Sequence, residues 1–160
     1  MAQIIVGIAD FKISNKIDDS IVTYALGSCV AIVVYDWDAK IGGMLHYMLS
    51  DSMIDARKAA EKPAMFADTG IPLLFKSCYK AGAEKRRMNV KVIGGARILD
   101  RDGHFEIGQK NIVAARKIFW KNNVIVDAED TGGDFNRTVR LDMATGRTHV
   151  YNAQGYDREL

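Results

Sequence analysis

Residues 23–36 read TYALGSCVAIVVYD and place Cys29 between a Gly-Ser turn and a run of β-branched residues. Such a run is typical of a buried strand, so we predict a strand over Val30–Trp37. An Asp-rich turn follows it. The apolar stretch Gly42–Leu49 then predicts a second strand that pairs with the first as a hairpin. Cys29 is either a small buried apolar residue, which is the common role of a free cysteine, or a nucleophile.

The rest of the chain alternates between strand and helix patterns. Strands are predicted over Ile4–Ile8, Ile21–Leu26, Asn89–Leu99 with a break at Gly94–Gly95, Val124–Asp130, and a hairpin over Arg137–Tyr151. Helices are predicted over Met65–Lys80, with a kink or a later start at Pro72, and over Phe105–Asn123. About eight or nine strands and two helices indicate an α+β layered domain with the helices on one face of sheet. No linker-like stretch interrupts residues 1–160, so a single domain is predicted.

Composition argues against several classes of protein. The 160 residues carry a formal net charge of +2, which is too small and too scattered for the basic stripe of a nucleic-acid binder. The first residues lack the basic start of a signal peptide, and every apolar run is shorter than the roughly 18 residues of a membrane span. A cytoplasmic protein without membrane insertion is therefore expected. Two cysteines are too few for a disulfide framework, and no phosphate-loop or clustered metal-ligand motif occurs, so neither nucleotide nor metal is expected.

Chemistry at Cys29 requires a proton acceptor, because a free thiol has a pKa of about 8.5 and is mostly protonated at neutral pH. His46 is the best candidate among three histidines. Cys29 precedes its strand and His46 comes late in the next one, and antiparallel pairing brings the start of one strand beside the end of the other. His104 falls in a glycine-containing loop and His149 in the terminal hairpin, neither with an obvious route to Cys29. His46 also fits a satisfied core histidine, because it shares a strand face with two methionines.

Three further residues can complete such a site. Thr23 precedes Cys29 by six positions, and its hydroxyl can orient His46 through a hydrogen bond. Gly27 and Ser28 permit a close approach of the substrate, and backbone N–H groups near Cys29 can stabilise a tetrahedral oxyanion. The second cysteine, Cys78, is flanked by helix formers and is expected to be an inert core residue.

Six segments, in this order, resemble the chemoreceptor glutamine deamidase family (CheD) of bacterial and archaeal chemotaxis. They are VTYALGSCVAIVVYD, IGGMLHYMLS, KPAMFADTGIPLLF, VKVIGGARIL, IGQKNIVAAR and AEDTGGDFNRTVRLDMATG. The resemblance implies a three-layer α/β/β sandwich, with mixed sheets and two main helices on one face. Ala25 departs from the common family pattern GLGSC, and Ser50 stands where the family often has proline. Neither change removes a reacting group, so the resemblance implies that activity is retained.

The resemblance also implies a function. Family members are protein-glutamine deamidases that convert particular receptor glutamines to glutamates and release ammonia. We expect no metal or organic cofactor, because thiolate attack on an amide needs only proton transfer and oxyanion support. The family roles fall on Cys29 as nucleophile, His46 as its partner and Thr23 as an assisting residue. Implied partners are the cytoplasmic helices of chemoreceptors (methyl-accepting chemotaxis proteins) and a chemotaxis phosphatase of the CheC type. The alternative is an interaction module that binds the phosphatase or a receptor helix with little or no catalysis.

Overall fold

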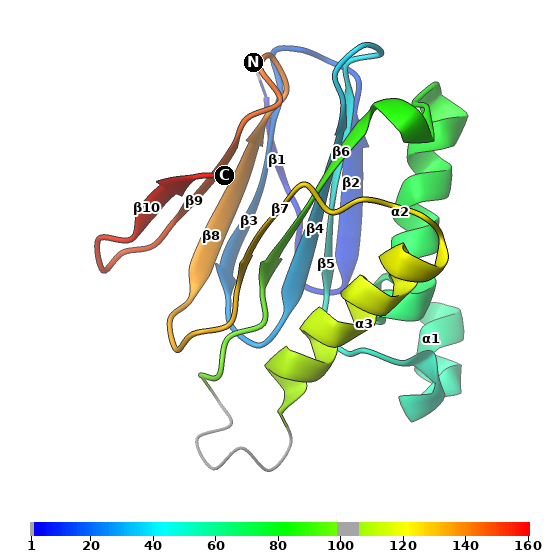
Figure 1. Cartoon of the computed structure of the whole chain (residues 1–160), viewed down its shortest axis with the longest axis vertical. Coiled ribbons are helices and arrows are strands. Elements are labelled where there is room, and N and C mark those ends of the chain that lie inside the picture. The colour runs from blue at the N-terminus through cyan, green and yellow to red at the C-terminus, as the bar shows by residue number, and fades with distance from the viewer. Residues whose placement is uncertain (1, 99–105) are drawn as a thin grey trace.

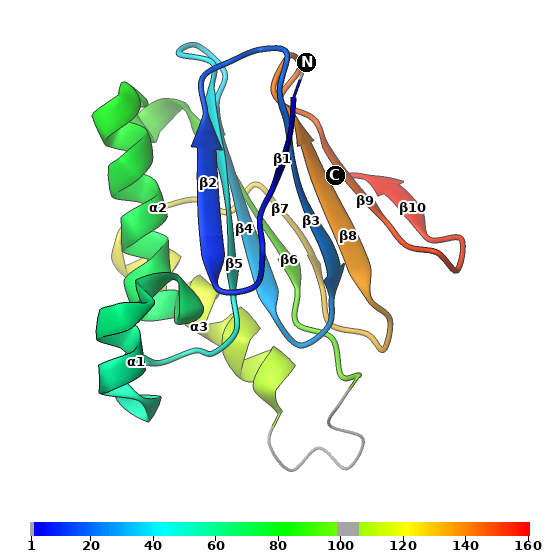
Figure 2. The same cartoon turned by 180° about the vertical axis from the view of Figure 1, so that it is seen from behind.

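The computed structural model describes residues 2–98 and 106–160, and it has three layers (Figure 1). Two five-stranded sheets face each other, and helices cover the outer face of one of them, as the view from behind also shows (Figure 2). This is the α/β/β sandwich, of the α+β class, that the resemblance implied. His104 and the far end of the strand predicted over Asn89–Leu99 lie outside the described residues.

The sheet in the middle layer, the central sheet, lies between the helices and the second sheet. Its strands in spatial order are β2 (Asp10–Ser14), β5 (Ile41–Tyr47), β4 (Val30–Asp36), β6 (Met88–Gly94) and β7 (Ala128–Thr131). All seven residues of β4 are buried, because β5 and β6 pair with both of its edges and layers pack on both of its faces. The predicted pairing of the β4 and β5 strands as an antiparallel hairpin is confirmed.

The second sheet, the outer sheet, is also mixed. Its strands in spatial order are β1 (Gln3–Ile5), β3 (Ser20–Leu26), β8 (Arg137–Asp142), β9 (Thr148–Tyr151) and β10 (Asp157–Glu159). β1 pairs parallel with β3, whereas the other pairs in this sheet are antiparallel. The hairpin predicted over Arg137–Tyr151 forms β8 and β9.

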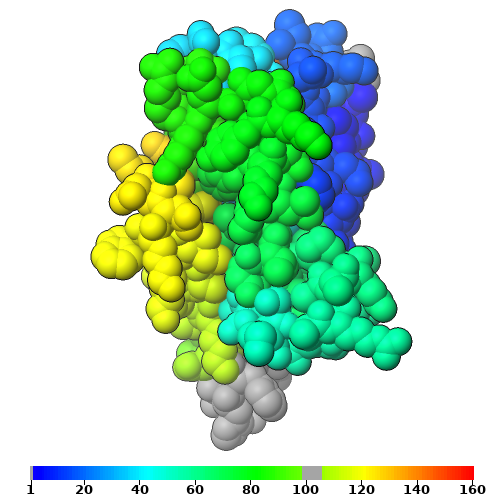
Figure 3. All heavy atoms as spheres, turned by 90° about the vertical axis from the view of Figure 1, so that its right-hand side faces the viewer, coloured from blue at the N-terminus to red at the C-terminus, as the bar shows by residue number. Residues whose placement is uncertain are grey.

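The helices form the third layer, and Figure 3 views the molecule from their side. The α-helices are α1 (Ala56–Glu61), α2 (Ala67–Ala81) and α3 (Ile107–Lys121); three 3₁₀ turns are η1 (Ser52–Ile54), η2 (Pro63–Met65) and η3 (Lys85–Arg87). α2 ends at Ala81, one residue beyond the predicted end at Lys80, because Gly82 takes the left-handed conformation with φ 116°. Among the described residues, no helix is long and apolar enough to cross a membrane.

Two hydrophobic cores hold the layers together. The first lies between the helices and the central sheet, where Leu74 of α2 and Phe119 of α3 pack beside strand residues such as Ile32. The second lies between the two sheets and includes Val33 of β4 and Val139 of β8. Because successive residues of a strand point to opposite faces, β4 contributes alternate side chains to the two cores.

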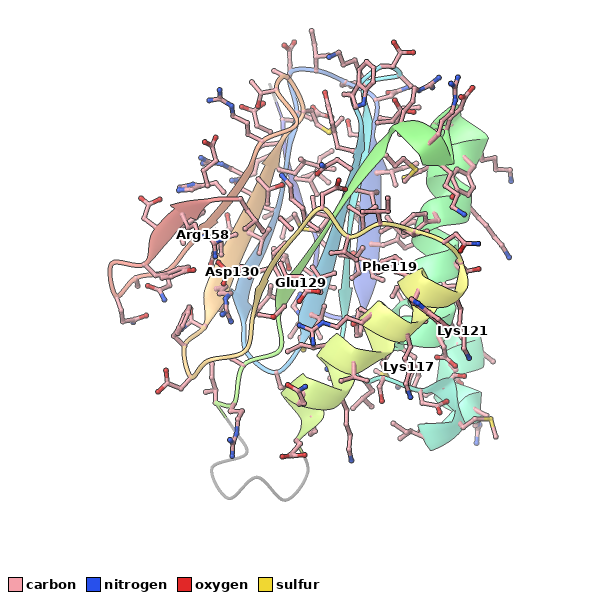
Figure 4. All side chains as sticks on the ribbon, viewed as in Figure 1. Lys117, Phe119, Lys121, Glu129, Asp130 and Arg158 are labelled. Atoms are coloured by element: carbon pink, nitrogen blue, oxygen red, sulfur yellow. The ribbon has the colours of Figure 1, made fainter. Side chains whose placement is uncertain are left out.

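Two adjacent acidic residues of β7 tie the three layers to one another. Glu129 accepts hydrogen bonds from Arg116 of α3, at 2.7 Å for the shorter contact, and Asp130 accepts one from Arg137 of β8 at 3.0 Å. Strand alternation explains why the two carboxylates point to opposite faces, as Figure 4 shows. Asp130 and Arg137 are both buried, and Asp130 also receives the Tyr156 hydroxyl at 2.6 Å, so its charge is well compensated.

The turn between β4 and β5 is closed by a buried carboxylate. Asp36 accepts backbone N–H groups from Asp38, Ala39 and Glu84 at 2.8–2.9 Å and a salt bridge from Arg87 at 3.0 Å. Burial alone would raise the pKa of Asp36, but the Arg87 guanidinium and these N–H donors lower it to about 2. The hairpin that carries the candidate site is thus fixed at its turn end.

Two strands, β2 and β10, and one α-helix, α1, escaped prediction, and several predicted elements have different bounds. The edge strands β2 and β10 carry charged residues, which is common at sheet edges but weakens the strand pattern, and α1 has only six residues. The predicted Ile4–Ile8 strand is confined to β1, and the strand predicted over Val124–Asp130 starts only at Ala128. β6 ends at Gly94, because Gly94 and Gly95 both adopt positive φ, and Pro72 lies inside α2 without ending it.

Ala25 carries local backbone strain beside Thr23. Its φ of 51° lies in the left-handed region that favours glycine, and it sits where the β3–β8 register shifts between Thr23 and Leu26. Replacing Ala25 by glycine should therefore raise the free energy of unfolding by up to about 1 kcal/mol, measured by urea denaturation. Ala144→Gly is the matched control, since Ala144 is an exposed turn residue without positive φ and should gain nothing. If the free energy of unfolding of Ala25→Gly is lower than that of the wild-type protein, the backbone at Ala25 is not strained.

Candidate active site

The β4–β5 hairpin brings Cys29 and His46 to the same end and the same face of the central sheet. His46 lies opposite Ala31 in the register, and Cys29 is two residues before Ala31, so the two side chains are diagonal neighbours facing the outer sheet. Cys29 is only partly buried and packs against the core between the sheets, whereas His46 is 2% exposed. The partly exposed Cys29 thiol at the end of the sheet thus lies near the buried His46 imidazole.

Thr23 reaches His46 from the other sheet. It lies on β3, is almost completely buried, and its Oγ1 lies 2.8 Å from Nδ1 of His46. The same hydroxyl donates its single proton to the carbonyl oxygen of Val6, also at 2.8 Å. Thr23 must therefore accept a hydrogen bond from His46, which requires the proton of the neutral ring to be on Nδ1.

This tautomer leaves Nε2 of His46 as the basic nitrogen. Nε2 is buried and has no hydrogen-bond partner within residues 2–98 and 106–160. An unpaired nitrogen such as Nε2 is costly to bury. Its lone pair is where a proton from a nearby thiol would bind. In the described structure Cys29 and His46 are neighbours without a hydrogen bond between them.

Electrostatics keep both groups neutral at rest. Burial lowers the pKa of His46 to about 4, and burial raises the pKa of the Cys29 thiol, with a smaller opposing effect of the Cys29 backbone N–H. Both shifts disfavour a charged pair, because each group is less stable in its ionised form away from water. The free protein therefore holds a thiol beside an imidazole rather than a thiolate beside an imidazolium.

The loop before Cys29 is held by the end of β6. The carbonyls of Gly27 and Cys29 each accept a backbone N–H at 2.9 Å, from Ala96 and Gly95 respectively. Gly94 makes this approach feasible: it has φ 113°, and a Cβ there would lie 2.4 Å from the Cys29 carbonyl oxygen. Gly27 and Ser28, which sequence predicted to line the site, are partly exposed beside Cys29.

The other candidate residues lie elsewhere. Cys78 is fully buried in the helix-side core, as predicted, and burial, with a smaller effect of the Asp36 charge, raises its pKa to about 12. His149 contacts Asp157 and stacks on Tyr151 in the terminal hairpin. No group of three or more His, Cys, Asp or Glu side chains in the described part of the chain could hold a metal ion.

Sequence reasoning missed two residues that shape the site. Val6 supplies the carbonyl that fixes the Thr23 proton, and no sequence signal marks a backbone carbonyl. Asn111, on α3, donates to the carbonyl of Ser28 at 2.9 Å. A signal existed for Asn111, because a polar residue four positions before Ala115 interrupts the apolar face of the predicted helix.

Fold and site together define a class: a three-layer sandwich whose hairpin holds a rim cysteine beside a hydroxyl-bound histidine. Residues 48–152 match the family described as "CheD chemotactic sensory transduction". A protein of Syntrophus aciditrophicus named "Probable chemoreceptor glutamine deamidase CheD 1" is 59% identical over 160 residues, which is all of both chains. The chain therefore belongs to the CheD family.

Two further relatives carry the name "Probable chemoreceptor glutamine deamidase CheD". The one from Solibacter usitatus is 48% identical over 160 residues, all of this chain and 94% of the relative. The one from Pyrococcus horikoshii is 40% identical over 152 residues, 94% of this chain and 92% of the relative. The family thus includes bacterial and archaeal relatives that match this chain over nearly their whole length.

The neutral resting pair makes a prediction for thiol reactivity. The rate of alkylation of Cys29 by iodoacetamide should rise with pH through an inflection above the ordinary thiol pKa of about 8.5, because burial raises the pKa of Cys29. Peptide mass mapping separates Cys29 from Cys78, and the urea-unfolded protein supplies the ordinary value. An inflection below neutral pH would reveal a preformed thiolate–imidazolium pair and contradict the neutral one.

Proposed function

We propose that this protein is a cysteine-dependent protein-glutamine deamidase that converts particular chemoreceptor glutamines to glutamate and releases ammonia. The observation that carries the proposal is the hydrogen bond between Thr23 and His46, which leaves Nε2 of His46 unprotonated on the same sheet face as Cys29. The names of the relatives support the choice of substrate, since they are called probable chemoreceptor glutamine deamidases.

The first step forms a thioester. As the Cys29 sulfur attacks the carbon of the glutamine carboxamide, its proton passes to Nε2 of His46. Transfer coupled to bond formation suits a neutral pair, because neither ion has to exist in the free protein. The negative charge moves to the carboxamide oxygen, where the Cys29 N–H and a neighbouring amide of the Gly27–Cys29 loop donate hydrogen bonds.

The second half returns the protein to its starting state. Collapse of the tetrahedral intermediate breaks the C–N bond, and the departing nitrogen takes the proton from Nε2 and leaves as ammonia. A water molecule then gives a proton to Nε2 and attacks the thioester carbon. The C–S bond breaks, the sulfur recovers its proton, and the side chain leaves as glutamate. Thr23 holds the ring in one orientation throughout.

The same proposal specifies the cellular location, the substrate and the partner of the protein. The whole chain, residues 1–160, acts as one deamidase domain in the cytoplasm, on the cytoplasmic helices of chemoreceptors, and requires no metal or organic cofactor. Each turnover replaces a neutral amide by a carboxylate, which changes the repulsion between neighbouring receptor helices. A chemotaxis phosphatase of the CheC type is the proposed regulatory partner, binding where the receptor binds.

The test is incubation of the protein with receptor cytoplasmic fragments, followed by mass spectrometry of the glutamine-bearing peptides. Cys29→Ala should abolish conversion, and His46→Ala should reduce kcat roughly 10²–10⁴-fold, because it removes the general base. Thr23→Val should reduce kcat by about tenfold, the value of one hydrogen bond to the ring.

Cys78→Ala is the matched control, because it removes the other thiol and should leave the conversion rate unchanged. If Cys29→Ala still converts glutamine, the mechanism is wrong. If the wild-type protein binds receptor fragments or the phosphatase tightly but converts nothing, the interaction module replaces the enzyme. An active Cys29→Ala together with an inactive, folded Cys78→Ala would show that the reacting thiol is Cys78 and not Cys29.

A further inference from the structure

A single buried amide joins the loop of Cys29 to the strand of His46. Asn111 is 0% exposed, and its Nδ2 donates to the carbonyl of Ser28 at 2.9 Å and to the carbonyl of Met48 at 2.8 Å. Ser28 immediately precedes the proposed nucleophile, and Met48 immediately follows β5. The backbone carbonyl of Asn111 is tied to the same strand, because it accepts the Tyr47 hydroxyl at 2.6 Å.

The orientation of this amide is determined by its partners. Both partners of the side chain are carbonyl oxygens, so the atom facing them must be the NH₂ group, since exchange of N and O would set three acceptors against one another. The remaining oxygen, Oδ1, is then buried and has no hydrogen-bond partner among the described residues. An unsatisfied buried acceptor opposes folding, and the two hydrogen bonds that Asn111 donates to the Ser28 and Met48 carbonyls offset that cost.

The bond to Ser28 fixes the direction of the next N–H group. A trans peptide is planar, with its C=O and N–H pointing in opposite directions, and no described peptide bond is cis. Because Asn111 holds the Ser28 carbonyl toward α3, the Cys29 N–H must point away from α3. Cys29 packs against the core between the two sheets, which is the face of the central sheet away from α3, so this N–H points to the side where the sulfur lies. Burial raises the pKa of the Cys29 thiol, and this same N–H lowers it.

We propose that Asn111 is a positioning residue for the chemistry at Cys29. It holds the Ser28–Cys29 peptide so that the Cys29 N–H faces the reacting atoms, and it keeps the Cys29 loop in register with the end of the His46 strand. The role in stabilising an oxyanion rests on the proposed function. The role in orienting the N–H toward sulfur holds for any reaction of Cys29.

The experiment compares Asn111→Ala with the wild-type protein by two readouts. The first is the pH profile of Cys29 alkylation by iodoacetamide, in which the variant should react more slowly and its inflection should move to higher pH. The second is deamidation of receptor fragments, in which kcat should fall about tenfold or more with KM little changed, because a misdirected donor weakens binding of the oxyanion only. Asn111→Ser keeps one donor, so its alkylation rate and its kcat should lie between those of the wild-type protein and those of Asn111→Ala.

Two controls separate positioning from simple loss of stability. Phe119→Leu trims a buried core residue at the other end of α3, seen between that helix and the central sheet in Figure 4. Asn122→Ala removes an amide that donates to the Ile118 carbonyl at 2.7 Å on the exposed end of the same helix. Both variants should keep the wild-type alkylation profile and kcat, even where their melting temperatures fall.

The proposal is overturned if Asn111→Ala keeps the wild-type alkylation profile, or if its kcat is no lower than that of Phe119→Leu. If Asn111→Ala fails to fold, Asn111→Ser decides by the same readouts, and a wild-type profile in it also overturns the proposal. If the wild-type protein deamidates nothing, alkylation alone decides, so failure of the proposed function is distinguishable from failure of this inference.

Discussion

The hydrogen bond between the Thr23 hydroxyl and the His46 ring is the contact on which the site depends. It crosses from the outer sheet to the central sheet, so it exists only when the two sheets pack at the correct distance and register. The Val6 carbonyl gives the bond its direction by taking the hydroxyl proton. The packing of the two sheets thereby determines the tautomer of His46, with the proton on Nδ1 and a free lone pair on Nε2.

Other constraints in the fold protect this geometry. The Asp36 carboxylate closes the turn of the hairpin that carries both Cys29 and His46, and the Asp130–Arg137 pair ties the central sheet to the outer sheet. At the rim, Gly94 allows the end of β6 to approach the Cys29 carbonyl closely. Rigid strands and buried pairs thus support a small loop whose cysteine stays partly exposed.

The neutral resting pair has a consequence for selectivity. A thiol that ionises readily would react with many electrophiles and oxidants, whereas one with a raised pKa is inert until a suitable carbonyl is placed beside it. In the free protein, partial burial therefore keeps the Cys29 thiol protonated and weakly reactive. Under the proposed mechanism, the thiol is activated by the position of the substrate carbonyl and by nearby hydrogen-bond donors.

Much of the fold and of the candidate site could be predicted from the sequence, because the signals lie in short local patterns. The β-branched run after Cys29 predicts β4, the Asp-rich turn predicts the hairpin, and antiparallel geometry then brings His46 toward Cys29. Thr23 could be suggested only as a neighbour, because the packing of one sheet on another is not written in a local pattern. The low pKa of His46 and the role of Asn111 depend on complete burial, which is a property of the folded molecule.

The protonation state of His46 tests the central claim most directly. Long-range ¹H–¹⁵N correlation spectra of the ¹⁵N-histidine-labelled protein, with His46→Gln used for assignment, report which ring nitrogen carries a proton. At pH 7 the account predicts a neutral His46 with a protonated Nδ1 and a bare Nε2, and this state should persist until the pH approaches its pKa of about 4. A ring protonated on Nε2, or an imidazolium at pH 7, would contradict it.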